Sequence, residues 1–333
     1  MRRVTVADIM RETGLSRATV DRVLNNRGHV HDRPRAVVDE AFRQLSMPGA
    51  PVPPGPLVAD VALRVGRGMM AQVRAAWTQC GAEGAFHDLH MADDAAVLRC
   101  VEGLCKDVSR PLILTAKTSD RLNAVLAGAR ARGKRIIAMV SDLAPSARDA
   151  FIGRDARAAG QTAAFLIGRM LGDRPTTVGV VLGSPAFRCH EDREIGFRTG
   201  LRAHFPKVII SGEAQGEDSA DLTRRAVADL LARHPALGAI YNVGGGNAGM
   251  IEALRSLGRV TDMLVIGHEV NPVTQPLLQS GAMDFAISGN PSEMLAAALR
   301  LAGAMAPSQG SPANLCSFGI YTRFNLPGFI GPS

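Results

Sequence analysis

The feature that most constrains the fold of this 333-residue chain is a series of ten short apolar runs, separated by amphipathic stretches. Runs such as PLILTAK (111–117) and TTVGVVLGS (176–184) are largely apolar and lack a strict polar–apolar alternation. Strands of this kind are buried on both faces, as in parallel sheets that helices cover on both sides. Ten such strands are too many for one compact sheet, so we expect an α/β fold with two similar lobes.

Residues 1–46 follow a different pattern, that of short amphipathic helices. A capping-box-like start at Thr5 opens the first predicted helix, Ser16 can cap a second helix through Asn25, and Pro34 suits the first turn of a third. A glycine-containing turn joins the first two helices. This arrangement indicates a helix-turn-helix unit.

Five prolines lie between residues 46 and 56, where they exclude a regular helix and favour an extended linker. We therefore predict a helix-turn-helix headpiece over 1–46, a proline-rich linker over 47–56 and a two-lobed α/β domain over 57–333. The expected fold class is an α-helical headpiece followed by parallel sheets with helices on both faces.

The stretch VTVADIMRETGLSRATVDRVLNNRGHVHDRPRAVVDEAFRQL (4–45) resembles the amino-terminal headpiece of LacI-type, or lactose-repressor-like, transcriptional regulators. Its G-x-S-x-x-T-V turn at 14–20 matches the family's turn and recognition helix. The family's hinge helix, in contrast, is replaced by prolines. The resemblance implies base-reading or phosphate-contacting roles for Thr5, Ser16, Arg17, Ala18, Thr19, Arg22 and Asn25.

The rest of the chain resembles the periplasmic-binding-protein-like sensor domain of the same family. The resemblance implies three chain crossings between two lobes, which we place near 142–150, 271–284 and 314–321. The first lobe then comprises about 57–145 and 284–313, and the second about 150–272 and 318–330.

Polar residues near the carboxyl ends of the predicted strands are the candidate ligand contacts, because ligands of open α/β sheets bind at these ends. The R-x-x-G-F pattern implies that Arg193 bonds a ligand hydroxyl or carboxylate, and Glu269 stands where the family usually has an Asp. The predicted ligand-binding residues are Arg67, Asp142, Arg154, Asp155, Arg193, Asn242, Glu269 and Asn290.

An enzyme is the less favoured interpretation. The G-x-G-x-x-G stretch at 244–249 lies deep in the chain rather than in a first βα unit, and Asn247 can instead cap a helix. Ser184 and His190 lack the G-x-S-x-G context of a nucleophile elbow. None of the five cysteines forms a C-x-x-C pair. We therefore predict no catalytic residue, no metal site and no cofactor.

These observations lead to one predicted function and two alternatives. A net charge of +7 permits binding to a polyanion, and Asp8 and Glu12 interrupt any signal peptide at the start. We predict a cytoplasmic, homodimeric repressor that binds double-stranded operator DNA, with no membrane partner, under control of a sugar, polyol or sugar acid between its lobes. The alternatives are a solute-binding protein without DNA function and a Rossmann-like enzyme.

Overall fold

The computed structural model describes residues 6–13, 15–24, 37–38, 57–171, 175–303 and 314–326. The chain divides into two compact units, Met1–Gly55 and Pro56–Ser333. The predicted roles of Thr5 and Asn25, most of the third predicted helix and the linker over 47–56 lie outside the described residues.

In its described part, the first unit has the short helices α1 (Val6–Thr13) and α2 (Arg17–Leu24) around a small apolar core. Ser16 caps α2 as expected, because its Oγ accepts a hydrogen bond of 3.3 Å from the Thr19 amide. Buried apolar side chains hold the helices together, and these are Ile9, Val20, Val23 and Val38. The side chains of Ser16, Arg17, Ala18 and Arg22 are exposed, and that of Thr19 is half-buried.

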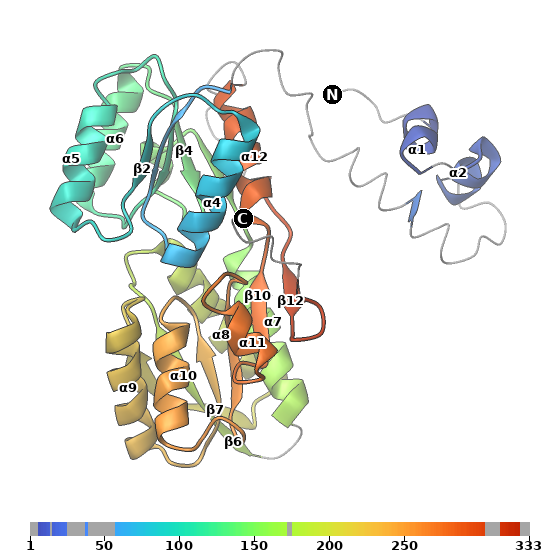
Figure 1. The fold of residues 1–333 in the computed structure, drawn as a ribbon, viewed down its shortest axis with the longest axis vertical. Coiled ribbons are helices and arrows are strands. Elements are labelled where there is room, and N and C mark those ends of the chain that lie inside the picture. The colour runs from blue at the N-terminus through green and yellow to red at the C-terminus, as the bar shows by residue number, and fades with distance from the viewer. Residues whose placement is uncertain are drawn as a thin grey trace. The chain divides into compact units, whose positions relative to one another are not determined.

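The second unit begins with a parallel sheet that forms the first lobe (Figure 1). Within the described residues its strand order is β11-β5-β4-β3-β1-β2. The strands are β1 (Asp60–Leu63), β2 (Phe86–Asp88), β3 (Leu112–Thr115), β4 (Ile136–Met139), β5 (Ala150–Gly153) and β11 (Asn314–Leu315). Every pairing in this sheet is parallel.

Helices cover both faces of this sheet. On one face lie α4 (Arg67–Cys80) and α12 (Pro291–Gly303), which pack against each other through residues such as Val73 and Leu295. On the other lie α5 (Asp94–Leu104), α6 (Asp120–Ala131) and the 3-10 turn η1 (Pro145–Ala147). The central strands are therefore buried on both faces, as their continuous apolar runs predict.

A second sheet, with the order β12-β10-β9-β8-β6-β7 among the described residues, forms the second lobe. Its strands are β6 (Thr176–Leu182), β7 (Val208–Gln215), β8 (Leu237–Asn242), β9 (Leu264–His268), β10 (Phe285–Ser288) and β12 (Gly319–Tyr321). Only β12 runs antiparallel to its neighbour within the described part of this sheet. Each of the ten predicted apolar runs contains one of the strands β1 to β10, which confirms the two-lobed α/β fold.

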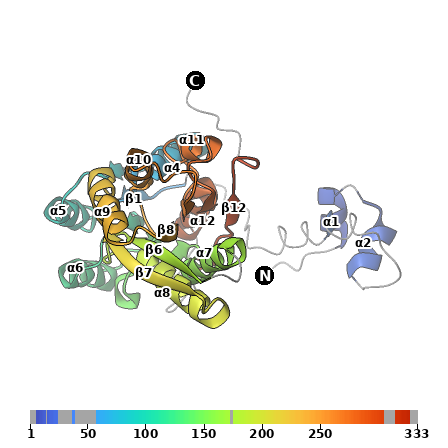
Figure 2. The same cartoon turned by 90° about the horizontal axis from the view of Figure 1, so that it is seen from below.

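The second sheet lies between two pairs of long helices (Figure 2). On one side are α7 (Ala156–Leu171) and α8 (Arg188–His204), and on the other α9 (Ala220–Arg233) and α10 (Asn247–Ser256), with the short α11 (Gln275–Gln279). Helices α7 and α8 approach closely because Gly160 lies against the Arg193 backbone, where an added Cβ would be 2.0 Å from the Arg193 carbonyl oxygen. This contact fixes the position of Arg193.

The chain crosses between the lobes at places that differ from two of the three predicted ones. The first crossing follows β5 and the second follows β10, later than the predicted 142–150 and 271–284. The reason is sheet pairing: β5 adds to the first sheet beside β4, and β10 adds to the second beside β9. The third crossing, between β11 and β12, falls within the predicted 314–321.

Among the described residues, no helix combines the length and the apolar character that crossing a bilayer requires.

Candidate functional site

A buried ion pair lies where the two lobes meet. Arg154 follows β5 at the first crossing, and Glu269 follows β9 of the second lobe. The two guanidinium nitrogens Nη1 and Nη2 donate to Oε1 and Oε2 of Glu269 at 2.8 and 3.0 Å. The side chains are only 8% and 17% exposed. This is the bidentate geometry in which arginine binds a carboxylate most strongly.

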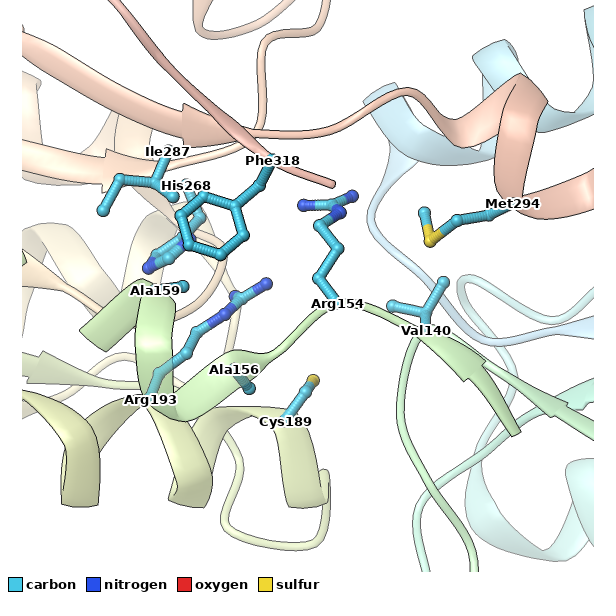
Figure 3. Close-up of a pocket in the computed structure, with 10 residues that line it drawn as sticks. All are labelled: Val140, Arg154, Ala156, Ala159, Cys189, Arg193, His268, Ile287, Met294 and Phe318. Carbon is cyan, nitrogen blue, oxygen red and sulfur yellow. The ribbon is translucent and has the colours of Figure 1, made fainter. Parts of the chain in front are cut away.

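Arg193, on α8, is the second cation of the site. Its Nη1 donates to the Val243 carbonyl oxygen at 2.8 Å, and its Nη2 lies 3.5 Å from Glu269 Oε1. Its Nε is buried and has no hydrogen-bond partner among the described residues. Figure 3 shows the guanidinium groups of Arg154 and Arg193 both pointing toward the space beside Phe318.

Both members of the Arg154–Glu269 pair are ionised. Burial by itself raises the pKa of Glu269, but the charge and hydrogen bonds of Arg154 outweigh it and hold this pKa below its ordinary value. Burial likewise opposes the charge of Arg154, yet the adjacent Glu269 carboxylate leaves the pKa of Arg154 raised. The pair therefore stays charged near neutral pH.

The imidazole, thiol and phenol groups beside the pair are neutral. Burial, followed by the positive charges of Arg193 and Arg154, holds the pKa of His268 well below its ordinary value. Burial raises the pKa of the Cys189 thiol and of the Tyr241 hydroxyl. Tyr241 and His268 are joined by a hydrogen bond of 2.8 Å between the hydroxyl oxygen and Nε2.

Two residues at the strand ends have a left-handed backbone. Val140, directly after β4, has a φ of 69°, and Glu269, directly after β9, has a φ of 68°. This conformation is costly for a β-branched valine, on the order of 1–3 kcal/mol, and such strain clusters at functional sites. The Glu269 amide donates to the Ile287 carbonyl oxygen at 3.1 Å, and its carbonyl oxygen accepts from Thr274 Oγ1 at 2.6 Å. These bonds hold the carboxylate in place.

The cavity at this site is closed. It has a volume of about 10 Å³, and its walls come from both lobes, as Val140 and Met294 of the first lobe face Arg193 and Phe318 (Figure 3). Its lining residues are Val140, Arg154, Ala156, Ala159, Cys189, Arg193, His268, Ile287, Met294 and Phe318. A space of this size holds about one water molecule. A larger ligand can enter only if the lobes separate.

Direct contacts between the lobes maintain this closed arrangement. Gln72 Nε2 on α4 donates to the Val270 carbonyl oxygen at 3.0 Å, and the Thr118 amide donates to the Ala186 carbonyl oxygen at 3.0 Å. Val270, Thr118 and Ala186 lie in loops that follow strands, and Gln72 lies in the second turn of α4. These hydrogen bonds have to break when the cleft opens.

The structure brings together three of the eight predicted ligand-binding residues, Arg154, Arg193 and Glu269. Asp155 and Asn290 instead bond amides at the starts of α7 and α12, with distances of 2.9 Å to Ala158 and 3.0 Å to Ser292. Arg67 is exposed in the first turn of α4.

Asn242 is buried and its side chain is turned toward its own loop. Its Nδ2 donates to the Gly245 carbonyl oxygen and to Asn247 Oδ1, and its Oδ1 accepts from the Gly244 amide. The N-cap of α10 is Gly246, so the expected cap at Asn247 is wrong by one position. Gly246 fills this place because the backbone there has a φ of 79°, which glycine adopts without strain.

Asp142 lies in a second, open depression of about 310 Å³ between the lobes. Its carboxylate pairs with Arg148, whose Nη2 donates to Oδ2 at 2.8 Å. Its polar lining also includes Thr118 and Asn123 on one side and Arg157 and Arg188 on the other, beside apolar residues such as Leu143.

Several residues that line the cavity were not among the predicted ligand contacts. His268 directly precedes Glu269, and Phe318 lies in the third predicted crossing, so both positions carried a usable signal. Val140 and Met294 look like ordinary apolar positions of a strand and a helix. Only the tertiary structure places them at the cleft.

A sequence profile described as the periplasmic binding protein domain matches residues 111–309. A comparison with curated proteins found no match.

Solved structures of sugar-binding proteins share the fold of the second unit. A solute-binding protein of an ABC transporter from Burkholderia graminis, in complex with D-arabinose, has a TM-score of 0.73 at 19% identity, covering 81% of this chain and 96% of that chain. The glucose-galactose binding protein GanP from Geobacillus stearothermophilus has a TM-score of 0.71 at 18% identity, covering 81% and 99%. A protein from Actinobacillus succinogenes with bound D-allose gives 0.67 at 16%, covering 80% and 98%.

The comparisons contradict the predicted function. The matched structures are sugar-binding proteins, several from ABC transporters, so the prediction of a DNA-binding transcriptional repressor of the LacI type is wrong. The predicted cytoplasmic location is also wrong, because the periplasmic profile and the solute-binding neighbours point outside the cytoplasm. Nothing in the comparisons supports operator DNA or a homodimer as partners. A pair of short helices indicates a local fold, and it does not determine what that fold binds.

The alternative of a solute-binding protein agrees better with these findings, and the matched proteins are not enzymes. The profile covers well over half of the 333 residues, including strands of both sheets. The chain therefore belongs to the family of periplasmic binding protein domains.

Proposed function

We propose that this chain is a solute-binding protein that closes its two lobes around a small sugar or a sugar-like polar molecule. The observation that carries the proposal is the cluster of Arg154, Arg193 and Glu269, which lies at the strand ends between two closed lobes. Planar guanidinium and carboxylate groups form paired hydrogen bonds with adjacent hydroxyls. The matched proteins with D-arabinose and D-allose support this ligand class.

We propose Arg154, Arg193 and Glu269 as the principal ligand contacts. Arg67, Asp142, Asp155, Asn242 and Asn290 remain predicted contacts, and each would have to leave its present environment or meet the ligand at the rim of the cleft. Asp142 is the best placed of these five, because it lines the open depression between the lobes.

The proposed function can be tested by calorimetry and thermal unfolding of the full chain with D-arabinose, D-allose, D-glucose, D-galactose and the acids derived from them. A ligand at about 100 times its Kd stabilises the folded state by about 2.7 kcal/mol, because it binds only that state. We expect at least one of these sugars, or an acid derived from one, to bind and stabilise the chain. Absence of binding by all of them would contradict the proposal.

A variant with Arg154 replaced by alanine should lose this binding, whereas Arg224→Ala should retain it. Arg224 is a suitable control because it lies on α9, at 3.9 Å from Glu252 in a largely exposed pair.

A further inference from the structure

The charges that surround the closed cavity do not balance. Two guanidinium groups, those of Arg154 and Arg193, line it, and Glu269 is the one carboxylate that bonds either of them among the described residues. The side chains of both arginines are more than nine-tenths buried. Arginine does not lose its proton in proteins, so within the part of the chain that the structure describes the site holds one positive charge without a counterion.

The neighbouring titratable groups do not supply the missing negative charge. His268 and Cys189 are neutral, because the pKa of the imidazole is lowered and that of the thiol is raised by burial. The charge of Asp218 acts on Cys189, but Asp218 does not line the cavity; its side chain is 26% exposed, and its Oδ2 lies 3.7 Å from His190 Nδ1. It also accepts a hydrogen bond of 2.6 Å from the Gly245 amide.

The uncompensated charge belongs to Arg193 rather than to Arg154. Arg154 uses both terminal nitrogens on the two oxygens of Glu269. Arg193 uses Nη1 on a backbone carbonyl, while its Nη2 is 3.5 Å from the nearest Glu269 oxygen and its Nε has no partner among the described residues. Nε and Nη2 form one edge of the guanidinium plane. This edge matches the spacing of two carboxylate oxygens.

We propose that the solute is a monoanion, a sugar acid whose carboxylate binds the Nε–Nη2 edge of Arg193 while its hydroxyls bond Arg154 and Glu269. This inference rests on the proposed function and narrows its ligand class. A buried charge without a partner is costly, and a ligand carboxylate removes this cost, which a neutral sugar cannot do. Binding requires the lobes to part first, since the closed cavity of about 10 Å³ is too small for a sugar acid.

The test compares matched pairs of ligands on the full chain by titration calorimetry, in a buffer without carboxylates or phosphate. The pairs are D-glucose with D-glucuronate and D-galactose with D-galacturonate. Hydrogen bonds to charged groups contribute more than neutral ones, so we expect an acid to bind at least about tenfold more tightly than its parent sugar. Equal or tighter binding of the parent sugars would overturn the anion inference and leave the proposed function standing. Binding of none of the four would overturn both.

The role of Arg193 is tested by Arg193→Lys, which keeps the charge and removes the planar edge. We expect the acid to lose about tenfold or more in affinity and the parent sugar to lose less. Arg224→Lys on the surface of α9 is the matched control and should bind like the parent chain. An unchanged preference for the acid in Arg193→Lys would overturn the assignment to this residue. The ligand pairs on the unsubstituted chain decide the anion inference even if the variant does not fold.

Discussion

Glu269 is the residue on which the site depends at the smallest scale. It joins Arg154 of the first crossing to Arg193 of the second lobe, and its backbone has a φ of 68°. The carboxylate compensates one of two buried positive charges. Its removal therefore affects both the stability of the fold and the electrostatics of the cleft.

We predict that Glu269→Gln lowers the free energy of unfolding by about 3 kcal/mol at pH 7, because it leaves the buried Arg154 without a counterion. The pKa of Glu269 is held below its ordinary value in the folded state, so its stabilisation is present above the unfolded-state pKa of about 4.5 and is lost as the pH falls through the lower folded-state pKa. Urea unfolding at several pH values between pH 3 and pH 7 measures this effect. The difference in the free energy of unfolding between the two proteins should shrink as the pH falls.

Glu252→Gln is the control for this prediction, because Glu252 is 70% exposed and lies 3.9 Å from Arg224. An exposed pair contributes about 0–1 kcal/mol. A Glu269→Gln variant as stable as Glu252→Gln at pH 7 would show that the buried pair does not stabilise the fold.

At the scale of the elements, the packing of α7 against α8 positions Arg193. Gly160 on α7 lies against the Arg193 backbone, and Gly196 on α8 lies against the Arg157 backbone, where an added Cβ would be 2.0 and 2.1 Å from the respective carbonyl oxygens. Backbone atoms cannot move aside as flexible side chains do. The two helices therefore need glycine at both positions.

We predict that Gly160→Ala destabilises the fold by about 1–3 kcal/mol, the usual cost of overpacking, and weakens ligand binding because α8 and Arg193 are displaced. Thermal unfolding and calorimetry measure the two effects. Gly103→Ala is the matched control, since Gly103 lies in α5 with open space at its Cβ position. There alanine should stabilise the helix by about 0.5–1 kcal/mol. Equal stabilities of the two variants would contradict the proposed packing role.

At the scale of the whole second unit, closure of the lobes is the feature that determines ligand access. The amino-terminal part of α4 packs against the loop after β9, where Gly68 faces Asn271, and Gln72 bonds Val270. A Cβ at Gly68 would lie 2.4 Å from Asn271 Cγ. Because Gly68 and Asn271 belong to opposite lobes, a small side chain at position 68 destabilises the closed arrangement and not the fold of either lobe.

We predict that Gly68→Ala shifts the chain toward separated lobes. Overpacking of about 1–3 kcal/mol in the closed form would weaken ligand binding at least about fivefold. Small-angle X-ray scattering should show a larger radius of gyration without ligand. Gly66→Ala is the control, because Gly66 has open space at its Cβ position and an ordinary φ of −60°. A scattering curve of Gly68→Ala that matches this control would refute the prediction.

The sequence by itself determined the strands, the order of the elements and the two lobes. Continuous apolar runs such as those of β3 and β6 predict buried parallel strands, because a strand that helices cover on both faces needs apolar side chains on both faces. Motif positions also pointed to Arg193 and Glu269, and strand-end position pointed to Arg154. The prediction of the biochemical role is wrong at the headpiece, because a local helix pattern does not specify a DNA partner.

Only the tertiary structure decided which of the polar strand-end residues form one site. Arg154 and Glu269 are separated by 115 positions in the chain and meet because two separate sheets bring their carboxyl ends to one cleft. The same pattern of a polar residue after an apolar run gives a cavity-lining group at Arg154, whereas the Asn242 side chain bonds its own loop. Sequence spacing cannot distinguish these outcomes, because the direction of a side chain and the charge balance around it depend on what the opposite lobe places there.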